Sequence, residues 1–250
     1  IRTTTMKILY LIYGFISYAV GLGGLTFFIL FVGGWDFLPV HVDSGTPGPI
    51  GPALATNVGL ILLFGLQHTV MARPAFKKLW ATIVPSALER STYVLISGVL
   101  MLLISFYWQP MEGAIWVIDN SLLSGILVAL YIAGWLIAVV ATFLINHFEL
   151  FGLQQVWFGF RDQPVPAHRF TERFLYKLVR HPLQMGIVIG LWATPYMSMS
   201  HFTLAVLMTV YIIVGLHYEE IDLEQFLGEA YRDYKQRVPK LIPFSKKLGL

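Results

Sequence analysis

The sequence predicts an all-α integral membrane protein with about six transmembrane helices, the last two of which form a helical hairpin. Its residues are 56% hydrophobic and only 12% charged, and the mean hydropathy of +0.68 lies well above that of soluble proteins. Several apolar segments reach the length of roughly 17 to 25 residues that a helix needs to cross the hydrocarbon core. A third observation, the placement of the basic residues, predicts the direction of each crossing.

Basic residues occur in only some of the segments between the apolar runs. All 17 Lys and Arg residues lie in the amino-terminal tail, 73–90, 161–180 or 232–247. The loops 34–52 and 109–120 contain acidic residues and no Lys or Arg. Because cytoplasmic loops retain basic residues, both termini and the segments 73–90 and 149–180 are expected on the cytoplasmic side of a bacterial inner membrane. Six transmembrane helices through the lipid bilayer place all of these basic segments on the cytoplasmic side.

The first two spans are predicted from apolar length and from the residues that interrupt it. Residues 8–33 are continuously apolar and contain glycines that permit close helix approach. The Gly- and Pro-rich stretch 44–52 then reads as an external loop. A second span covers about 53–72 and ends at Arg73, because Pro74 stops the helix or begins another.

An amphipathic segment and two further spans follow. Residues 73–90 place apolar side chains beside basic ones, which suits a helix that lies at an anionic inner leaflet. The third span, about 91–108, starts at the cap-like Ser91, and the fourth covers about 121–148. At about 1.5 Å per residue the fourth exceeds the thickness of the core, so its end is expected to tilt or to project into the cytoplasm.

The carboxyl-terminal part begins with a polar connection and continues as the hairpin. Residues 152–175 are rich in aromatic side chains, including Phe170, and suit a cytoplasmic lid. Two apolar segments, about 183–197 and 201–218, then meet in a tight turn. The first of them is short for a full crossing and is expected to tilt or to depend on its neighbours.

The residue types disfavour several classes of chemistry. The chain has no cysteine, and therefore neither a disulfide nor a thiolate metal site. Its seven histidines include no pair within four residues, which disfavours a histidine-rich metal site. The glycine cluster 21–24 lies inside an apolar span rather than after a strand, so it does not predict a nucleotide-binding loop. Neither a metal nor a nucleic acid partner is expected.

Ionisable and phenolic residues gather at the cytoplasmic ends of the last two spans. An ionisable side chain at membrane depth costs on the order of several kcal/mol unless it is paired or solvated, so such a group indicates a site. The group contains Glu219, Glu220, Arg180, His181, Tyr176, Tyr231 and Tyr234. It suits a zwitterionic cofactor with an aromatic base, because the cations bind a carboxylate and the carboxylates bind an amine or ribose hydroxyls.

Four motifs follow one another in this region. They are Arg180-His181-Pro182-x-x-x-Gly186, Glu219-Glu220-x-x-Leu223, Phe226-x-Gly228-x-x-Tyr231-x-x-Tyr234 and Val238-Pro239-x-x-Ile242-Pro243. As a set they resemble the S-adenosylmethionine-binding half of the isoprenylcysteine carboxyl methyltransferase superfamily. Three upstream stretches, 67–77, 89–95 and 146–153, are similar to its bacterial methanethiol S-methyltransferase branch. The resemblance thus reaches most of the chain from about residue 60.

The resemblance implies transfer of the sulfonium methyl group of S-adenosyl-L-methionine to a small thiol, giving dimethyl sulfide from methanethiol. In-line attack requires a thiolate held about 3 to 3.5 Å from the methyl carbon. Because an alkyl thiol is mostly protonated at neutral pH, a nearby base or cation is expected. The candidates for this thiol activation are Arg73, His147 and Glu149, although each is equally well explained as part of a helix-end ion pair, for example between Arg73 and Glu149.

The resemblance also implies a division of the chain and a set of cofactor-binding residues. Residues 1–150 are expected to form the first four spans, and 151–250 the lid, the hairpin and the S-adenosylmethionine-binding region. The cofactor-binding candidates are Tyr176, Leu178, Val179, Arg180, His181, Pro182, Gly186, Glu219, Glu220, Tyr231 and Tyr234.

Three other readings of the same residues stay open. The acceptor is an isoprenylcysteine-like or other lipid carboxylate in the first. In the second the chain is a membrane reductase of related architecture that uses a nicotinamide cofactor. The third is a noncatalytic membrane scaffold. The sequence makes no prediction of the oligomeric state.

Overall fold

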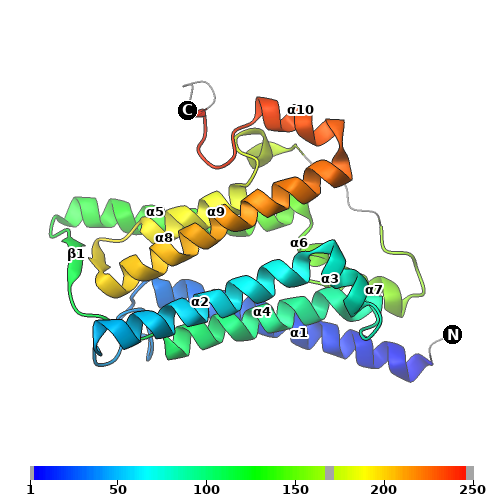
Figure 1. The fold of residues 1–250 in the computed structure, drawn as a ribbon, viewed down its shortest axis with the longest axis horizontal. Coiled ribbons are helices and arrows are strands. Elements are labelled where there is room, and N and C mark those ends of the chain that lie inside the picture. Colours follow the sequence, from blue (N-terminus) through cyan, green and yellow to red (C-terminus); the bar gives the residue numbers. More distant parts are fainter. Residues whose placement is uncertain (1–2, 167–171, 246–250) are drawn as a thin grey trace. The chain divides into compact units, whose positions relative to one another are not determined.

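The computed structural model describes residues 3–166 and 172–245, and helices are its main elements (Figure 1). Five of these helices are long and apolar enough to cross a membrane. They are α1 (Thr4–Val32), α2 (Ile50–Ala72), α4 (Ser86–Tyr107), α5 (Ser121–Ile145) and α9 (Met199–Leu227). The prediction of an all-α integral membrane protein is confirmed.

The remaining elements are short. They are α3 (Pro74–Trp80), α6 (His147–Leu150), α7 (Leu153–Phe160), the 3₁₀ turn η1 (Phe174–Lys177), α8 (Pro182–Trp192), α10 (Glu229–Arg237) and the strands β1 (Ala114–Val117) and β2 (Tyr196–Ser198). The first arm of the expected hairpin is α8, whose 11 residues span about 16 Å at 1.5 Å each. It therefore cannot cross the core alone, which agrees with its short apolar run in the sequence.

The described chain packs into two compact units. The first contains α1 to α4, α6 and α7, within the bounds 1–112 and 146–169. The second contains β1, α5, η1, α8, β2, α9 and α10, within 113–145 and 170–250. This grouping by packing differs from the functional division at residue 150, which stays a prediction.

In the first unit, glycines allow α1 and α4 to pack backbone against backbone. A methyl group added at Gly24 would lie 2.4 Å from the carbonyl oxygen of Gly98, and one added at Gly98 would lie 2.6 Å from the Cα atom of Gly21. No larger residue fits at such a crossing unless the helices separate. Small residues at helix contacts favour association in lipid, where the hydrophobic effect between helices is weak.

Side-chain hydrogen bonds join α2 to α4 and to the segment that follows α4. The Asn57 amide donates to the Gln109 carbonyl over 2.8 Å and accepts from the Gln109 N–H over 2.8 Å. Closer to the other end of α2, His68 Nδ1 lies 3.2 Å from the Ser97 hydroxyl on α4. Polar contacts between helices satisfy groups that lipid cannot.

Two predicted helix boundaries are wrong. α4 begins at Ser86 rather than Ser91, and Ser91 lies buried inside it, where its hydroxyl donates to the Gly152 carbonyl over 3.3 Å. The predicted fourth span, 121–148, ends instead at Ile145. Asn146 interrupts the helix because its side chain accepts from the Glu149 N–H and so caps the separate helix α6.

The second unit repeats the use of glycine at a helix crossing, here between α5 and α8. A methyl group at Gly186 would lie 2.4 Å from the Gly134 carbonyl oxygen. Beyond α8 the chain forms β2, which pairs antiparallel with β1. This small sheet was not predicted from the sequence, because the paired residues lie about 80 positions apart in loops without strand periodicity.

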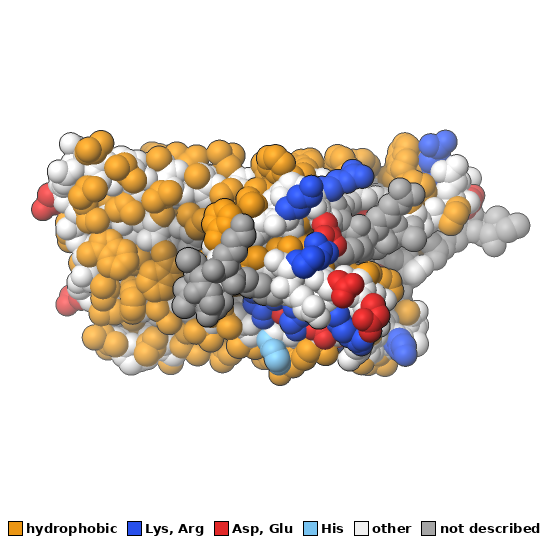
Figure 2. All heavy atoms as spheres, turned by 90° about the horizontal axis from the view of Figure 1, so that it is seen from above, with side chains coloured by type: hydrophobic (Ala, Val, Ile, Leu, Met, Phe, Trp, Pro, Cys, Tyr) orange, Lys and Arg blue, Asp and Glu red, His pale blue; other side chains and the backbone are white. Residues whose placement is uncertain are grey.

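Apolar side chains remain exposed along the spanning helices. Examples on α5 are Leu122, Ile126 and Phe143. Hydrophobic side chains cover much of the face drawn in Figure 2. On a soluble protein such a surface would drive aggregation, whereas in a bilayer it faces the acyl chains.

Candidate functional site

The buried carboxylate Glu220 organises the polar residues of the second unit. It lies near the end of α9, a helix of 29 residues that extends about 43 Å at 1.5 Å per residue. This exceeds a hydrocarbon core of about 30 Å, so α9 is tilted or extends beyond the core. The Glu220 side chain is nevertheless only 5% exposed. A buried carboxylate needs charged or hydrogen-bonding partners.

Arg180 supplies the closest positive charge. Its Nε and Nη2 atoms lie 2.8 Å and 2.7 Å from Glu220 Oε1. Its Nη1 atom donates to the carbonyl oxygens of Lys235 and Val238, at the end of α10. The guanidinium therefore pairs with the carboxylate and caps a helix end at the same time, and it is as buried as Glu220.

Three further side chains lie within hydrogen-bonding or ion-pair distance of the Glu220 carboxylate. His181 Nε2 lies 3.1 Å from Oε1, and the Tyr231 hydroxyl donates to the same oxygen over 3.4 Å. Lys240 Nζ lies 3.1 Å from the other oxygen, Oε2. These residues, with Arg180 and Glu220, are called the Glu220 cluster below.

Backbone contacts tie the segment before α8 to the segment after α10. The N–H groups of Arg180 and His181 donate to the carbonyls of Pro239 and Lys240 over 2.8 Å and 3.2 Å. Nearby, the Tyr234 hydroxyl donates to the Tyr176 carbonyl over 2.6 Å. The chain thus satisfies its own polar groups where it is not helical.

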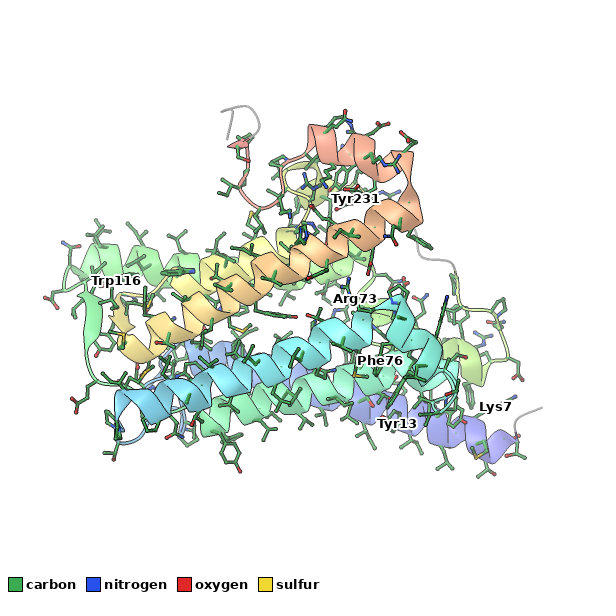
Figure 3. All side chains as sticks on the ribbon, viewed as in Figure 1. Lys7, Tyr13, Arg73, Phe76, Trp116 and Tyr231 are labelled. Carbon is green, nitrogen blue, oxygen red and sulfur yellow. The ribbon has the colours of Figure 1, made fainter. Side chains whose placement is uncertain are left out.

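α10 closes over this region through an aromatic core. Tyr231 and Tyr234 are almost fully buried, pack edge to face, and share a small core with Val238. In Figure 3 Tyr231 lies between α10 and the end of α9. Burial raises the pKa of both phenols, and the Glu220 charge adds to the effect at Tyr231, so both remain protonated donors at neutral pH.

The other cofactor-binding candidates occupy varied positions. Leu178 is exposed, Val179 is fully buried, and Pro182 is the first residue of α8. Gly186 lies at the crossing with α5, where its small size serves helix packing. Burial raises the pKa of the Tyr176 phenol, and the charge of the half-buried Glu219 raises it further. The role of each in ligand binding stays a prediction.

The three thiol-activation candidates belong to the first unit, and His147 is the most enclosed of them. Its Nε2 atom lies 2.9 Å from the Tyr18 hydroxyl of α1. The rings of Phe148 and Phe151 pack around the imidazole at centroid distances of 5.5 Å and 4.7 Å. Burial lowers the pKa of His147, which keeps the ring neutral at pH 7.

Glu149 and Arg73 each have a local partner. Glu149 Oε2 accepts from the Asn146 side chain over 3.2 Å, beside the cap of α6. Arg73 joins α2 to α3, and its Nε atom donates to the Thr69 carbonyl over 3.3 Å. Neither contact assigns a catalytic role, so both residues stay candidates.

Sequence reasoning missed several residues of these two sites. Lys240 was visible only as a variable position between the two prolines of a motif, and its contact with Glu220 depends on the fold. Tyr18 lies in a long apolar run, and nothing in the sequence pairs it with His147.

Within the residues that the structure describes, no three His, Asp or Glu side chains are grouped so that they could hold a metal ion.

Comparison with known proteins gives several relatives along nearly the whole chain. A methanethiol S-methyltransferase of Mycobacterium tuberculosis is 42% identical over 238 residues, which cover 95% of this chain and 97% of that protein. Methanethiol S-methyltransferase 2 of Bradyrhizobium diazoefficiens is 41% identical over 233 residues, covering 93% and 89%. A Nurim homolog of Drosophila pseudoobscura pseudoobscura is 30% identical over 195 residues, covering 76% and 77%. No protein-family model and no solved structure matches the chain.

Proposed function

Because the chain belongs to the methanethiol S-methyltransferase family, we propose that it transfers a methyl group from S-adenosyl-L-methionine to methanethiol, giving dimethyl sulfide. The observation that carries the proposal is the identity of 41% to 44% with relatives of that name over most of their length. The Glu220 cluster supports it independently, because its charges suit a small zwitterionic ligand.

The Glu220 cluster fits the methyl donor by its chemistry. The donor carries an ammonium and a carboxylate, and the cluster offers the Glu220 carboxylate and the Lys240 ammonium within 3.1 Å of each other. Arg180, His181 and Tyr231 hold the carboxylate in place from its other oxygen. When bound, the donor supplies an electrophilic methyl group on a sulfonium sulfur.

The acceptor side of the reaction needs a group that takes the thiol proton. As the new bond between the thiol sulfur and the methyl carbon forms, the bond from that carbon to the sulfonium sulfur breaks, and the thiol proton passes to a base. A neutral imidazole accepts a proton, and burial keeps His147 neutral. Arg73 and Glu149 are the other candidates, the first as a cation that favours the thiolate.

The charge pattern supports an orientation in the membrane. We place the protein in a bacterial inner membrane with both termini and the Glu220 cluster on the cytoplasmic side, where the donor is made. α3 and the turn after it present Lys77, Lys78 and the exposed side chains of Leu79 and Ile83. This combination suits contact with an anionic inner leaflet.

The test is turnover by the purified full chain in detergent with methyl-labelled S-adenosylmethionine. Labelled dimethyl sulfide in the headspace above methanethiol is the expected product. A labelled methyl ester on an isoprenylcysteine acceptor, formed in preference to dimethyl sulfide, would replace the thiol with a lipid carboxylate. Oxidation of NADPH without methyl transfer would indicate a reductase. If the chain showed none of these activities and did not bind the donor, the noncatalytic scaffold would be the remaining interpretation.

Alanine variants of the three thiol-activation candidates refine the same assay. Loss of a general base lowers turnover by about 10²- to 10⁴-fold, and the affinity for S-adenosylhomocysteine should not change. Full turnover by the Arg73, His147 or Glu149 variant removes that residue from the candidates.

A further inference from the structure

The two oxygens of the Glu220 carboxylate have different neighbours. Oε1 faces Arg180 over 2.7 Å and 2.8 Å, His181 over 3.1 Å and Tyr231 over 3.4 Å. Oε2 faces the ammonium groups of Lys240 over 3.1 Å and Lys235 over 4.0 Å. One oxygen is therefore fixed by buried groups, and the other faces lysine side chains.

The partners of Oε1 are not free to exchange for a ligand. The Arg180 side chain is 5% exposed, and its Nη1 group already donates hydrogen bonds to the carbonyls of Lys235 and Val238. Moving it would uncap α10 and leave Glu220 buried without its strongest counter-charge, and breaking a buried ion pair in this way is strongly destabilising. The expectation that Arg180 holds a donor carboxylate is thus less favoured than a positioning role.

Lys240 has the opposite character. Its side chain is 37% exposed, and its ammonium sits on a flexible four-carbon stem. Lys235 is similarly exposed but also forms a close ion pair with Glu224 of α9. Lys240 is therefore better suited than Arg180 or Lys235 to leave Oε2 and take another partner.

We propose that Glu220 Oε2 and Lys240 together form the subsite for the α-amino-acid end of the methyl donor, with Lys240 binding the carboxylate. The ligand's ammonium replaces the lysine ammonium at Oε2, which exchanges one cation for another of the same kind. The displaced Lys240 then pairs with the adjacent carboxylate of the ligand. The amino-acid end of the ligand carries no net charge, so the net charge of the Glu220 cluster does not change when the ligand binds. This inference depends on the proposed use of S-adenosylmethionine.

Three probes that differ only at the amino-acid end test the subsite. S-Adenosylhomocysteine carries both charges, its decarboxylated analogue keeps only the amine, and 5′-deoxy-5′-methylthioadenosine has neither. Their dissociation constants are measured by calorimetry on the full chain in detergent. The variants are Lys240→Met, which keeps most of the length of the side chain without its charge, and Lys240→Arg, which keeps the charge.

We expect Lys240→Met to reduce the preference for S-adenosylhomocysteine over its decarboxylated analogue at least tenfold, because the variant loses the partner of the ligand carboxylate and no longer competes with the ligand amine for Oε2. The dissociation constant of 5′-deoxy-5′-methylthioadenosine should stay within about twofold. Lys240→Arg should recover most of the loss. Arg232→Gln is the matched control, because it removes a cation from the same region whose partner, Glu229, lies on its own helix. It should change none of the three constants.

Other outcomes overturn the subsite. Equal weakening of all three probes by Lys240→Met indicates a general structural role, and an unchanged preference for S-adenosylhomocysteine over its decarboxylated analogue indicates no role. If Lys240→Met does not fold, the two dissociation constants of the wild-type chain test the subsite. Equal affinity for the decarboxylated analogue and for S-adenosylhomocysteine would mean that no residue binds the ligand carboxylate, and would overturn the subsite. Failure of the wild-type chain to bind any probe would instead overturn the proposed function.

Discussion

The Glu220 cluster in the second unit and the surroundings of His147 in the first bury polar groups by different means. Around Glu220, full charges are matched by Arg180 and Lys240. Around His147 the partners are a tyrosine hydroxyl and aromatic rings, and the imidazole is neutral. One site compensates buried charge, and the other avoids it.

The difference matches the two ligands of the proposed function. A site that contains paired positive and negative side chains suits a zwitterion, because the charged groups of the ligand can take the place of side-chain charges in those pairs. A neutral, aromatic enclosure suits an uncharged molecule such as a small thiol, which it need only orient and deprotonate. Under the proposed function, the first environment binds the donor and the second activates the acceptor, so single substitutions should affect the two unequally.

Glu220→Gln should give the largest effect, because it leaves Arg180 buried without its counter-charge. Removing one partner of a buried pair costs about 3–5 kcal/mol. We expect the free energy of unfolding to fall by an amount in this range, and S-adenosylhomocysteine to lose its stabilising effect. Thermal unfolding in detergent, with and without the ligand, measures both.

The matched control for this change is Glu229→Gln. Glu229 pairs with Arg232 on its own helix, and its side chain is 82% exposed. Exposed pairs contribute little to stability, so the unfolding temperature should hardly change. Similar losses in the two variants would mean that the Glu220 cluster is not the ionic centre described above.

Gly24→Ala should give an intermediate effect and probes a feature that the two units share, the glycine crossing. The new methyl group would lie 2.4 Å from the Gly98 carbonyl oxygen, so α1 and α4 must separate. Overpacking of this kind typically costs about 1–3 kcal/mol. Gly23→Ala is the control at the neighbouring position, where nothing lies within 4 Å. Equal unfolding temperatures for the two variants would contradict a close helix contact.

The smallest effect should be the contribution of His147 to the pH dependence of stability. Burial lowers the pKa of this residue from its ordinary value of 6.5, so below that pH the unfolded chain binds more protons than the folded one. Stability then falls on acidification, by at most about 1.4 kcal/mol per pH unit for one group. Unfolding followed from pH 7.5 to 5 should show a shallower loss in His147→Gln than in the wild type. An unchanged slope would show that His147 does not supply this dependence.

The spans and the family were predictable from the sequence because both depend on long, contiguous signals. A bilayer imposes a minimum apolar length, and five helices of that length are present in the described residues. The relatives confirm membership in the methyltransferase superfamily that the motifs indicated. Arg180, His181 and Glu220 also meet as their shared location at helix ends suggested.

What the sequence did not predict depends on contacts between distant segments. Lys240 and Arg180 are 60 positions apart, and their neighbourhood exists only because the backbone of 180–181 bonds to that of 239–240. The break at Asn146 depends on a cap that competes with an otherwise apolar helix. Phe170 and its part of the predicted lid lie outside the described residues.

The shortness of α8 links the protein to the lipids around it. Its 11 residues leave about 14 Å of a 30 Å core to be covered by other means. The bilayer accommodates such a segment by thinning or by changes in its tilt, at a modest cost for each ångström of mismatch. Since α8 begins directly after Arg180 and His181, the acyl-chain length of the host membrane should influence the geometry of the Glu220 cluster.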